Sequence, residues 1–210
     1  ALLNSKRESD SDVHDAVASI ITDIRNHGDQ ALLELTAKFD NLNVETVAGL
    51  AVGQDEMIAA LNGLDADLRA ALELAAYRIR TFHEKQLPQD LAYQDDAGVK
   101  LGMRFTPVDA AGLYVPGGKA AYPSSVLMNA IPAMVAGVDR RVMVVPARDG
   151  VVNPLVLAAA SLAGVSEVWR IGGAQAVAVL AYGTQTIGQV DKIVGPGNAF
   201  VAAAKQQVFG

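Results

Sequence analysis

The sequence predicts an α/β protein in which a helical N-terminal region, residues 1–105, precedes a parallel sheet with helices on both faces, residues 106–210. Up to about residue 88, apolar residues recur at intervals of three and four, as they do along one face of an amphipathic helix. From about residue 106, short and nearly all-apolar runs alternate with segments of helical pattern, which is typical of βαβ units in a buried parallel sheet. A turn containing glycine follows each of these runs.

Three helices are expected in the N-terminal region. The first carries apolar positions between residues 13 and 24, and Gly28 ends it. Asp29 can cap a second helix, whose apolar positions lie between residues 32 and 39. A long amphipathic helix over residues 65–86 stops before a proline, because the residue before proline disfavours the helical conformation. Its expected buried stripe consists of Leu68, Leu72, Ala75, Ile79 and Phe82.

Two extended segments interrupt this helical pattern. The run VAGLAV, residues 47–52, predicts a short strand. The run AYQDDAGVKLGMRF, residues 92–105, predicts a hairpin, because Asp95 to Gly98 supply turn residues and apolar residues alternate after them.

Four strand–turn–helix units follow in residues 106–210. AGLYV and RVMVV are the first two predicted strands, and EVWRI and DKIV are the next two. The helix after RVMVV has the clearest boundaries, with Asn153 as N-cap, Pro154 at the first helical position and Gly164 past its end. The turns PGG, PARDG, GGAQ and GPGN connect the strands to their helices.

These turns predict a nucleotide site. Parallel strands end on the same edge of a sheet, so the four turns gather along one rim, where open α/β sheets bind ligands. Glycine lets the backbone approach a ligand closely, and helix N-termini offer N–H groups to an anion such as a pyrophosphate. Tyr114, Gln175 and Asn198 are the polar side chains of interest at this rim, and Lys119 is a candidate for a phosphate.

Each of these residues also has a purely structural interpretation. A glycine turn alone can serve a sharp bend, and GPGNAF lacks the third glycine of the dinucleotide fingerprint. Asn198 can be an N-cap, Gln175 can make a contact near the start of its helix, and Tyr114 can be a core residue. Both interpretations stay open at this point.

Composition excludes several classes of partner. The net charge of −6 does not favour nucleic acid or an anionic membrane as a partner. The longest apolar stretch, residues 151–165, is too short to span a bilayer and contains an asparagine and a proline. The N-terminus turns polar at once, unlike a signal peptide, and there is no cysteine for disulfides or thiolate chemistry. We therefore expect a cytoplasmic protein.

The sequence offers no clear catalytic or metal-binding residue. The three histidines, His14, His27 and His83, all lie in the N-terminal region, and no two have the spacing of a helical metal pair. No histidine or glutamate occurs in the glycine turns, so no general base is predicted there.

Several motifs resemble those of the histidinol dehydrogenase family. AGLYVPGG, SSVLMNAIPAMVAGV, IGGAQAVAVLAYGT and VDKIVGPGNAFVAAAK occur in the order seen in that family. RNHGDQALLELTAKFD and IRTFHEKQLP are similar to its N-terminal helical region, so the resemblance covers essentially the whole chain.

The resemblance implies an enzyme that oxidises L-histidinol to the aldehyde and then to L-histidine, reducing two NAD⁺. It implies a zinc-dependent homodimer with incomplete Rossmann-like domains, in which residues 1–105 are part of a discontinuous domain and residues 106–210 contact NAD. By resemblance, the NAD contacts are Tyr114, Gln175 and Asn198.

The chain also departs from the family's pattern, because family members are far longer. Their zinc ligands, substrate-binding residues and catalytic glutamate–histidine pair lie beyond the point that matches the end of this chain. The resemblance therefore assigns no catalytic and no metal-binding residue here, and we expect the chain to be inactive alone.

Two other hypotheses remain. The chain can be a non-catalytic module of the same fold that binds a nucleotide or dimerises, or an unrelated α/β enzyme. The density of motifs argues against the unrelated enzyme. Comparing the mass of the intact protein with its reading frame would distinguish a part of a histidinol dehydrogenase from a separate module of the same fold.

Overall fold

The computed structural model describes residues 10–117 and 122–209. Gly118 of the PGG turn and Lys119, the phosphate candidate, lie outside the described residues. None of the helices in the described part of the chain combines the length and the apolar character that a membrane span needs.

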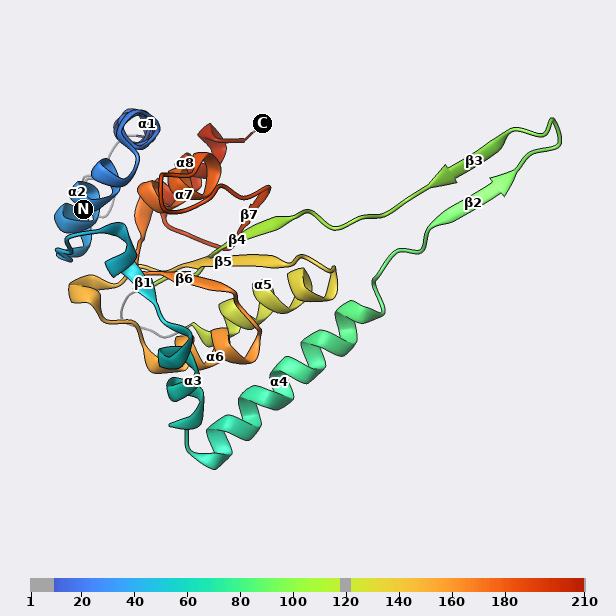
Figure 1. Ribbon diagram of the computed structural model, residues 1–210, viewed down its shortest axis with the longest axis horizontal. Coiled ribbons are helices and arrows are strands. Elements are labelled where there is room, and N and C mark those ends of the chain that lie inside the picture. The colour runs from blue at the N-terminus through green and yellow to red at the C-terminus, as the bar shows by residue number, and fades with distance from the viewer. Residues whose placement is uncertain (1–9, 118–121, 210) are drawn as a thin grey trace, which may run out of the picture.

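The centre of the fold is a five-stranded sheet in the order β1-β6-β5-β4-β7 (Figure 1). Its four main strands are parallel, as predicted, and only the short β1 runs antiparallel to its neighbour. The parallel strands are β4, Ala110–Tyr114, β5, Arg140–Val144, β6, Glu167–Trp169, and β7, Lys192–Val194. Numbered by their place among the parallel strands, they lie in the order 3-2-1-4, which is the order of a Rossmann-like sheet.

Helices cover both faces of the sheet, as predicted for a buried parallel sheet. One face carries α1, Asp10–His27, α2, Asp29–Asp40, α7, Gly173–Tyr182, and α8, Ala199–Gln207. The other carries α3, Gln54–Asn62, α4, Ala66–Glu84, α5, Pro123–Val135, and α6, Pro154–Leu162. In the described part of the chain, helices from the N-terminal region therefore contact the sheet layer from both sides.

The strands supply both hydrophobic cores by simple alternation. Val142 and Val144 of β5 belong to the core under α1, α2, α7 and α8, and Met143 belongs to the core on the opposite face. Successive side chains of a strand point to opposite faces, so the part of a strand that is covered on both sides is apolar on both faces. This requirement explains why the strands were visible in the sequence as nearly all-apolar runs.

Local capping signals were read correctly in α6. Asn153 is its N-cap and accepts a hydrogen bond from the backbone N–H of Leu155 at 2.9 Å, and Pro154 is its first residue. Gly164, just past its end, has a positive φ of 64°.

The prediction that Asp29 caps α2 was wrong. Gly28 is the N-cap residue, and Asp29 is already the first helical residue. From that position the Asp29 carboxylate reaches Thr186 instead, accepting a hydrogen bond from its hydroxyl at 2.6 Å. This bond ties α2 to the loop between α7 and β7.

The strand predicted over residues 47–52 is only partly present. Val47–Leu50 form a 3₁₀ helix, and only Ala51–Val52, strand β1, pair with the sheet. Val47 and Leu50 are both buried, and their spacing of three matches the 3₁₀ period, in which residues three apart share a face.

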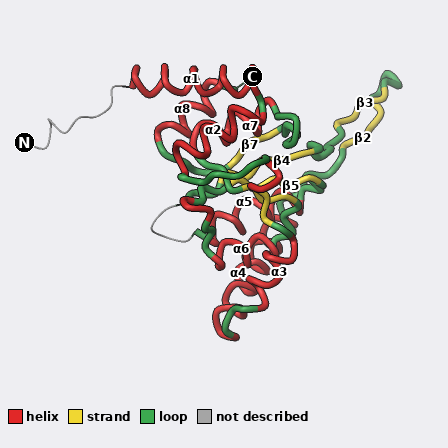
Figure 2. The backbone as a smooth tube through the Cα atoms, turned by 60° about the vertical axis from the view of Figure 1, so that its left-hand side comes forward, coloured by secondary structure: helices red, strands yellow, loops and turns green. Residues whose placement is uncertain are grey.

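The predicted hairpin is confirmed, and it forms an arm that projects away from the sheet. Strand β2, Leu91–Gln94, pairs antiparallel with β3, Lys100–Met103, and every residue of both strands is exposed. Figures 1 and 2 show this arm extending beyond the rest of the described chain.

The apolar stripe of α4 is not buried as predicted. Leu72 and Ala76 in the middle of the helix are buried, but Leu68 is 39% exposed and Phe82 is 60% exposed. The helix leaves the body of the fold towards the arm, so its end has nothing in the described chain to pack against (Figure 1). Helical periodicity identified the apolar face correctly but could not show that its partner is absent here.

Candidate functional site

A pocket of about 840 Å³ lies at the carboxyl ends of the strands, and we call it the rim pocket. It brings together Tyr114, Gln175 and Asn198, the three side chains predicted from the sequence. Gly117, Gly173 and Gly197 from the predicted glycine turns also line it. The pocket lies between the ends of β4 and β7, where the order of the strands reverses, and Rossmann-like sheets bind ligands at this switch point.

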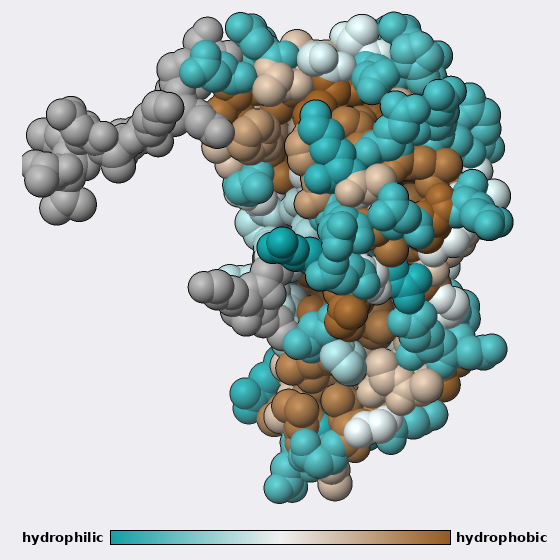
Figure 3. Space-filling view, turned by 90° about the vertical axis from the view of Figure 1, so that its left-hand side faces the viewer, coloured by the Kyte–Doolittle hydropathy of each residue, from teal (hydrophilic) through white to brown (hydrophobic). Residues whose placement is uncertain are grey.

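The surface around this rim is partly apolar. Figure 3 views the molecule from its left-hand side in Figure 1 and shows hydrophobic surface above and below a narrower waist. Phe39 and Phe200 line the rim pocket, and Phe39 is 51% exposed. Apolar walls with a few polar groups are typical of a site for a small organic ligand.

Tyr114 is the last residue of β4 and is only 3% exposed. Its phenol oxygen accepts a hydrogen bond from the backbone N–H of Gly173 at 3.1 Å, at the start of α7. Burial raises the pKa of the Tyr114 phenol above its ordinary value and the nearby Asp40 adds to the rise, whereas the Gly173 N–H opposes it. Tyr114 is therefore both a core residue and a neutral hydroxyl at the pocket wall, with its own hydrogen available as a donor.

Gln175 lies in the first turn of α7 and is 2% exposed. Gly173 makes room for it, because a Cβ at residue 173 would lie 2.6 Å from the Gln175 side-chain oxygen. Gly173 also has a φ of 64°, which favours glycine. The GGAQ turn thus places a buried amide in the wall of the pocket.

Asn198 is the N-cap of α8, so this structural interpretation is confirmed. Its side-chain oxygen accepts a hydrogen bond from the backbone N–H of Val201 at 3.1 Å. The cap uses the oxygen of the amide and leaves its N–H₂ group as a donor for another partner. Asn198 also lines the rim pocket, so capping and ligand contact are compatible roles.

Asp40 was missed by the sequence analysis, although it lines the same pocket. It is the last residue of α2 and is 8% exposed, and its Oδ2 atom has no hydrogen-bond partner among the described residues. Burial raises the pKa of the Asp40 carboxyl above its ordinary value, and the backbone N–H of Gly172 acts in the opposite direction. A signal was present in the sequence, because Asp40 follows Leu32 and Thr36 at intervals of four, which places the three residues on one face of the helix.

Arg148 was also missed and brings a positive charge to the pocket lining. It belongs to a short 3₁₀ turn, Arg148–Gly150, within the predicted turn PARDG. That turn is held beside the end of α2 by a hydrogen bond from the Asn41 amide to the Asp149 carboxylate. The rim pocket therefore contains a buried carboxylate and a guanidinium on neighbouring segments.

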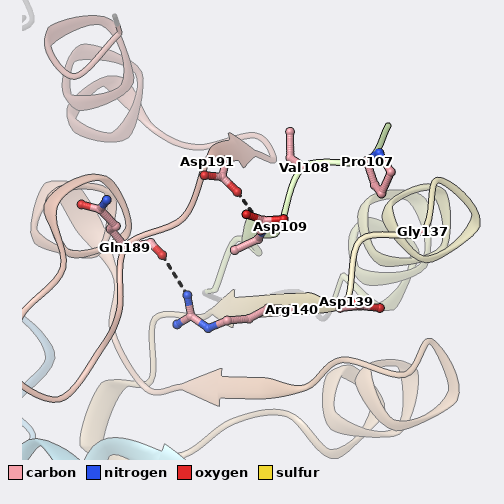
Figure 4. Close-up of a pocket in the computed structure, with 9 residues that line it drawn as sticks. Pro107, Val108, Asp109, Gly137, Asp139, Arg140, Gln189 and Asp191 are labelled. Atoms are coloured by element: carbon pink, nitrogen blue, oxygen red, sulfur yellow. Dashed lines mark hydrogen bonds between the residues drawn. The ribbon is translucent and has the colours of Figure 1, made fainter. Parts of the chain in front are cut away.

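A second pocket, of about 530 Å³, lies at the opposite, amino ends of the strands (Figure 4). Two of its charged side chains, Arg140 and Asp191, already have partners within the protein. Arg140 donates to the carbonyl oxygen of Gln189 at 2.8 Å and to the Glu167 carboxylate at 2.7 Å, and Asp191 accepts from the backbone N–H of Ala110 at 2.8 Å. These bonds hold the strands together, and we regard the rim pocket as the candidate site.

The strand order, the helices on both faces and the pocket at the switch point define a Rossmann-like α/β protein with a candidate ligand pocket. Comparison with known proteins narrows this class. The family model for histidinol dehydrogenase matches residues 3–210, and the chain belongs to the histidinol dehydrogenase family.

Individual relatives agree with this assignment. The chain is 62% identical over 210 residues to a histidinol dehydrogenase of Rhodospirillum rubrum and 60% identical to that of Ruegeria pomeroyi. Each match covers 100% of this chain and 48% of the relative, so the chain spans about half the length of the curated relatives it matches. The crystal structure of histidinol dehydrogenase from Elizabethkingia anophelis superposes with a TM-score of 0.88 at 36% identity, covering 97% of this chain and 46% of that one.

Proposed function

We propose that this chain is the NAD-contacting part of a histidinol dehydrogenase, which oxidises L-histidinol to L-histidine in two successive steps. The observation that carries the proposal is the convergence of Tyr114, Gln175 and Asn198 on one pocket at the switch point of the sheet. The geometry of a parallel sheet brings the glycine turns to one edge, and a common ligand would explain why three polar side chains from these turns line the same pocket.

The chemistry of the pocket suits a dinucleotide. The N-terminal turns of α7 and α8 lie at the pocket, where their backbone N–H groups favour an anion such as a pyrophosphate. Arg148 adds a positive charge, Tyr114 and Asn198 offer donors, and Phe39 and Phe200 offer apolar surface for a base. NAD⁺, when bound, would accept a hydride in each oxidation, and the residues of this chain would bind and orient it.

Zinc does not fit the residues present here. In the described ranges, no group of three or more histidine, aspartate or glutamate side chains is placed to hold a metal ion. We propose that the zinc of the longer enzymes depends on residues outside this match. Oxidation of an alcohol also needs a base for its proton, and we place that base outside this match as well.

The test measures binding and turnover separately on the purified 210-residue chain. Isothermal titration should detect weak NAD⁺ binding, because only part of the usual contact surface is present. Gln175→Ala and Asn198→Ala should each weaken it, and Gln206→Ala, at an exposed position on α8, should not. With histidinol, NAD⁺ and zinc, absorbance of the reduced cofactor should stay flat; turnover free of contaminating longer enzyme would contradict the proposal.

We also propose that the protein associates with itself through the arm and α4. The arm exposes Leu91, Tyr93, Leu101 and Met103, and α4 exposes Tyr77 at 64%. Exposed apolar surface of this extent is typical of an interaction surface. This observation supports the homodimer that the resemblance implies, with the arms as part of the contact.

Light scattering tests this part of the proposal. Tyr93 and Leu101 face each other across the hairpin, so replacing both by serine should lower the associated fraction. Lys100→Ser, at an exposed polar position of the same arm, serves as the matched control. A chain that is strictly monomeric at high concentration would argue against self-association.

A further inference from the structure

Asp40 is a buried carboxylate of which the fold leaves one oxygen, Oδ2, without a hydrogen-bond partner among the described residues. Its side chain is more than nine-tenths buried and lines the rim pocket. Buried carboxylate oxygens are normally paired, because removing a charge from water without compensation is unfavourable. An unpaired carboxylate oxygen on a residue that lines a pocket indicates that its partner comes with a ligand.

Thr36 provides an instructive comparison. It lies one turn before Asp40 on α2, is fully buried, and its Oγ1 atom is the other buried side-chain oxygen in the described chain without a partner. Thr36 does not line the rim pocket. A threonine hydroxyl can also turn towards the carbonyl of its own helix, whereas an ionised carboxylate can only accept, and helix carbonyls offer it no donor.

The charge of Asp40 limits what its partner can be. An ionised carboxylate accepts hydrogen bonds and repels phosphate, so the phosphates of a nucleotide belong elsewhere in the pocket. Arg148 and the N-termini of α7 and α8 suit those phosphates. The neutral donors that a nucleotide carries near its phosphates are the hydroxyls of its ribose.

The position of Asp40 in the fold supports this assignment. Rossmann-like proteins commonly bind a ribose hydroxyl with an acidic residue near the end of the second parallel strand. Here that strand is β5, and it is followed by the apolar residues Val145, Pro146 and Ala147. The next acid, Asp149, accepts a hydrogen bond from Asn41. Among the described residues that line the pocket, Asp40 is the one with a buried carboxylate oxygen that has no partner.

We propose that Asp40 accepts a hydrogen bond from a ribose hydroxyl of the bound dinucleotide and selects ligands that carry that hydroxyl. The inference rests on the proposed function, because it assumes that the rim pocket binds NAD⁺. The acid is supplied by α2, which lies outside the strand–helix units of the sheet, and this explains why the glycine turns alone did not reveal it.

The experiment compares NAD⁺ with analogues in which one ribose hydroxyl at a time is replaced by hydrogen. Binding is measured by isothermal titration to the unaltered chain, to Asp40→Ala and to Glu34→Ala. Glu34 is an exposed acid on the same helix, where it accepts from Gln30, and it serves as the matched control. The unaltered chain and Glu34→Ala should bind one analogue about tenfold or more weakly than NAD⁺, as expected for loss of a hydrogen bond to a charged group.

Asp40→Ala should lose this preference and bind that analogue within about twofold of NAD⁺. If Asp40→Ala does not fold, as judged by circular dichroism, Asp40→Asn replaces it and should show a smaller preference than the unaltered chain, because a neutral acceptor bonds less strongly. The inference is overturned if the unaltered chain distinguishes none of the analogues, or if the Asp40 variants keep its full preference. Failure of the unaltered chain to bind NAD⁺ itself would instead overturn the proposed function, and this inference with it.

Discussion

Replacing Tyr114 by phenylalanine removes the side-chain hydrogen bond to the backbone N–H of Gly173, the first residue of α7. The Tyr114 oxygen accepts from the Gly173 N–H at 3.1 Å, and the N-cap residue, Gly172, supplies no side-chain cap. The first N–H groups of a helix have no partner within the helix, so this tyrosine acts as a cap from a neighbouring strand.

The expected loss of stability follows from burial. Tyr114 is 3% exposed, so water cannot easily replace the lost oxygen, and a buried N–H left unpaired costs about 1–3 kcal/mol. For a chain of this length, each kcal/mol corresponds to a fall in Tm of about 2–4 °C. The ring itself remains, so no cavity larger than the oxygen is formed.

Urea unfolding followed by circular dichroism at pH 7 measures the change in the free energy of unfolding. Tyr182→Phe is the matched control. Tyr182 is the last residue of α7 and is 39% exposed. Its ring lies 4.8 Å from the Arg25 guanidinium, and phenylalanine keeps this contact. The control should change stability by less than about 0.5 kcal/mol. A Tyr114→Phe chain as stable as Tyr182→Phe would refute the capping role.

Three further perturbations test other features of the fold. Burial raises the pKa of Asp40 in the folded state, so its protonated form favours folding at low pH, and this advantage is lost as pH rises through the raised pKa. Asp40→Asn should therefore raise the free energy of unfolding, measured by urea, by on the order of 1 kcal/mol at pH 7 and by less at pH 4. Burial alone would raise the pKa of Glu167, but its hydrogen bonds and the charge of Arg140 leave that pKa below its ordinary value. Glu167→Gln should therefore lower the free energy of unfolding by about 0.5–1 kcal/mol at pH 7, and by progressively less as pH falls through the lowered pKa. An equal loss of stability at every pH would contradict this. Gly195→Ala should destabilise the protein by more than about 1 kcal/mol, because φ of Gly195 is 110° and the new Cβ would lie 2.0 Å from the carbonyl oxygen at the end of β4. The control Gly53→Ala has open space around the new Cβ and should be nearly neutral. Equal melting temperatures for the two variants would refute the steric argument.

Features that depend on neighbouring residues were predictable. The boundaries of α6 follow from Asn153, Pro154 and Gly164, since capping and proline effects act within one turn. The hairpin follows from its turn residues for the same reason. The parallel sheet follows from strands that are nearly all apolar, which indicates cover on both faces.

The candidate site was predicted only in part. Tyr114, Gln175 and Asn198 were found because each lies beside a glycine turn, and all such turns share one edge of a parallel sheet. Arg148 lies within the glycine turn PARDG but was not singled out, and Asp40 lies beside no glycine turn. Asp40 reaches the pocket only because α2 packs against α7, a contact between residues far apart in the chain.

The sequence by itself determined the alternation of strands and helices, the rim on which the glycine turns meet, and the family to which its motifs point, because these depend on local pattern and on the geometry of any parallel sheet. The tertiary structure decided which faces are covered and which polar groups meet at the rim. Helical periodicity marked the α4 stripe as apolar, yet Phe82 is exposed, and it gave no indication that Asp40 would be buried and line a pocket. The physical reason is that burial and hydrogen bonding depend on what packs against a residue, and for both of these residues the neighbours come from distant parts of the chain or are absent from the described residues.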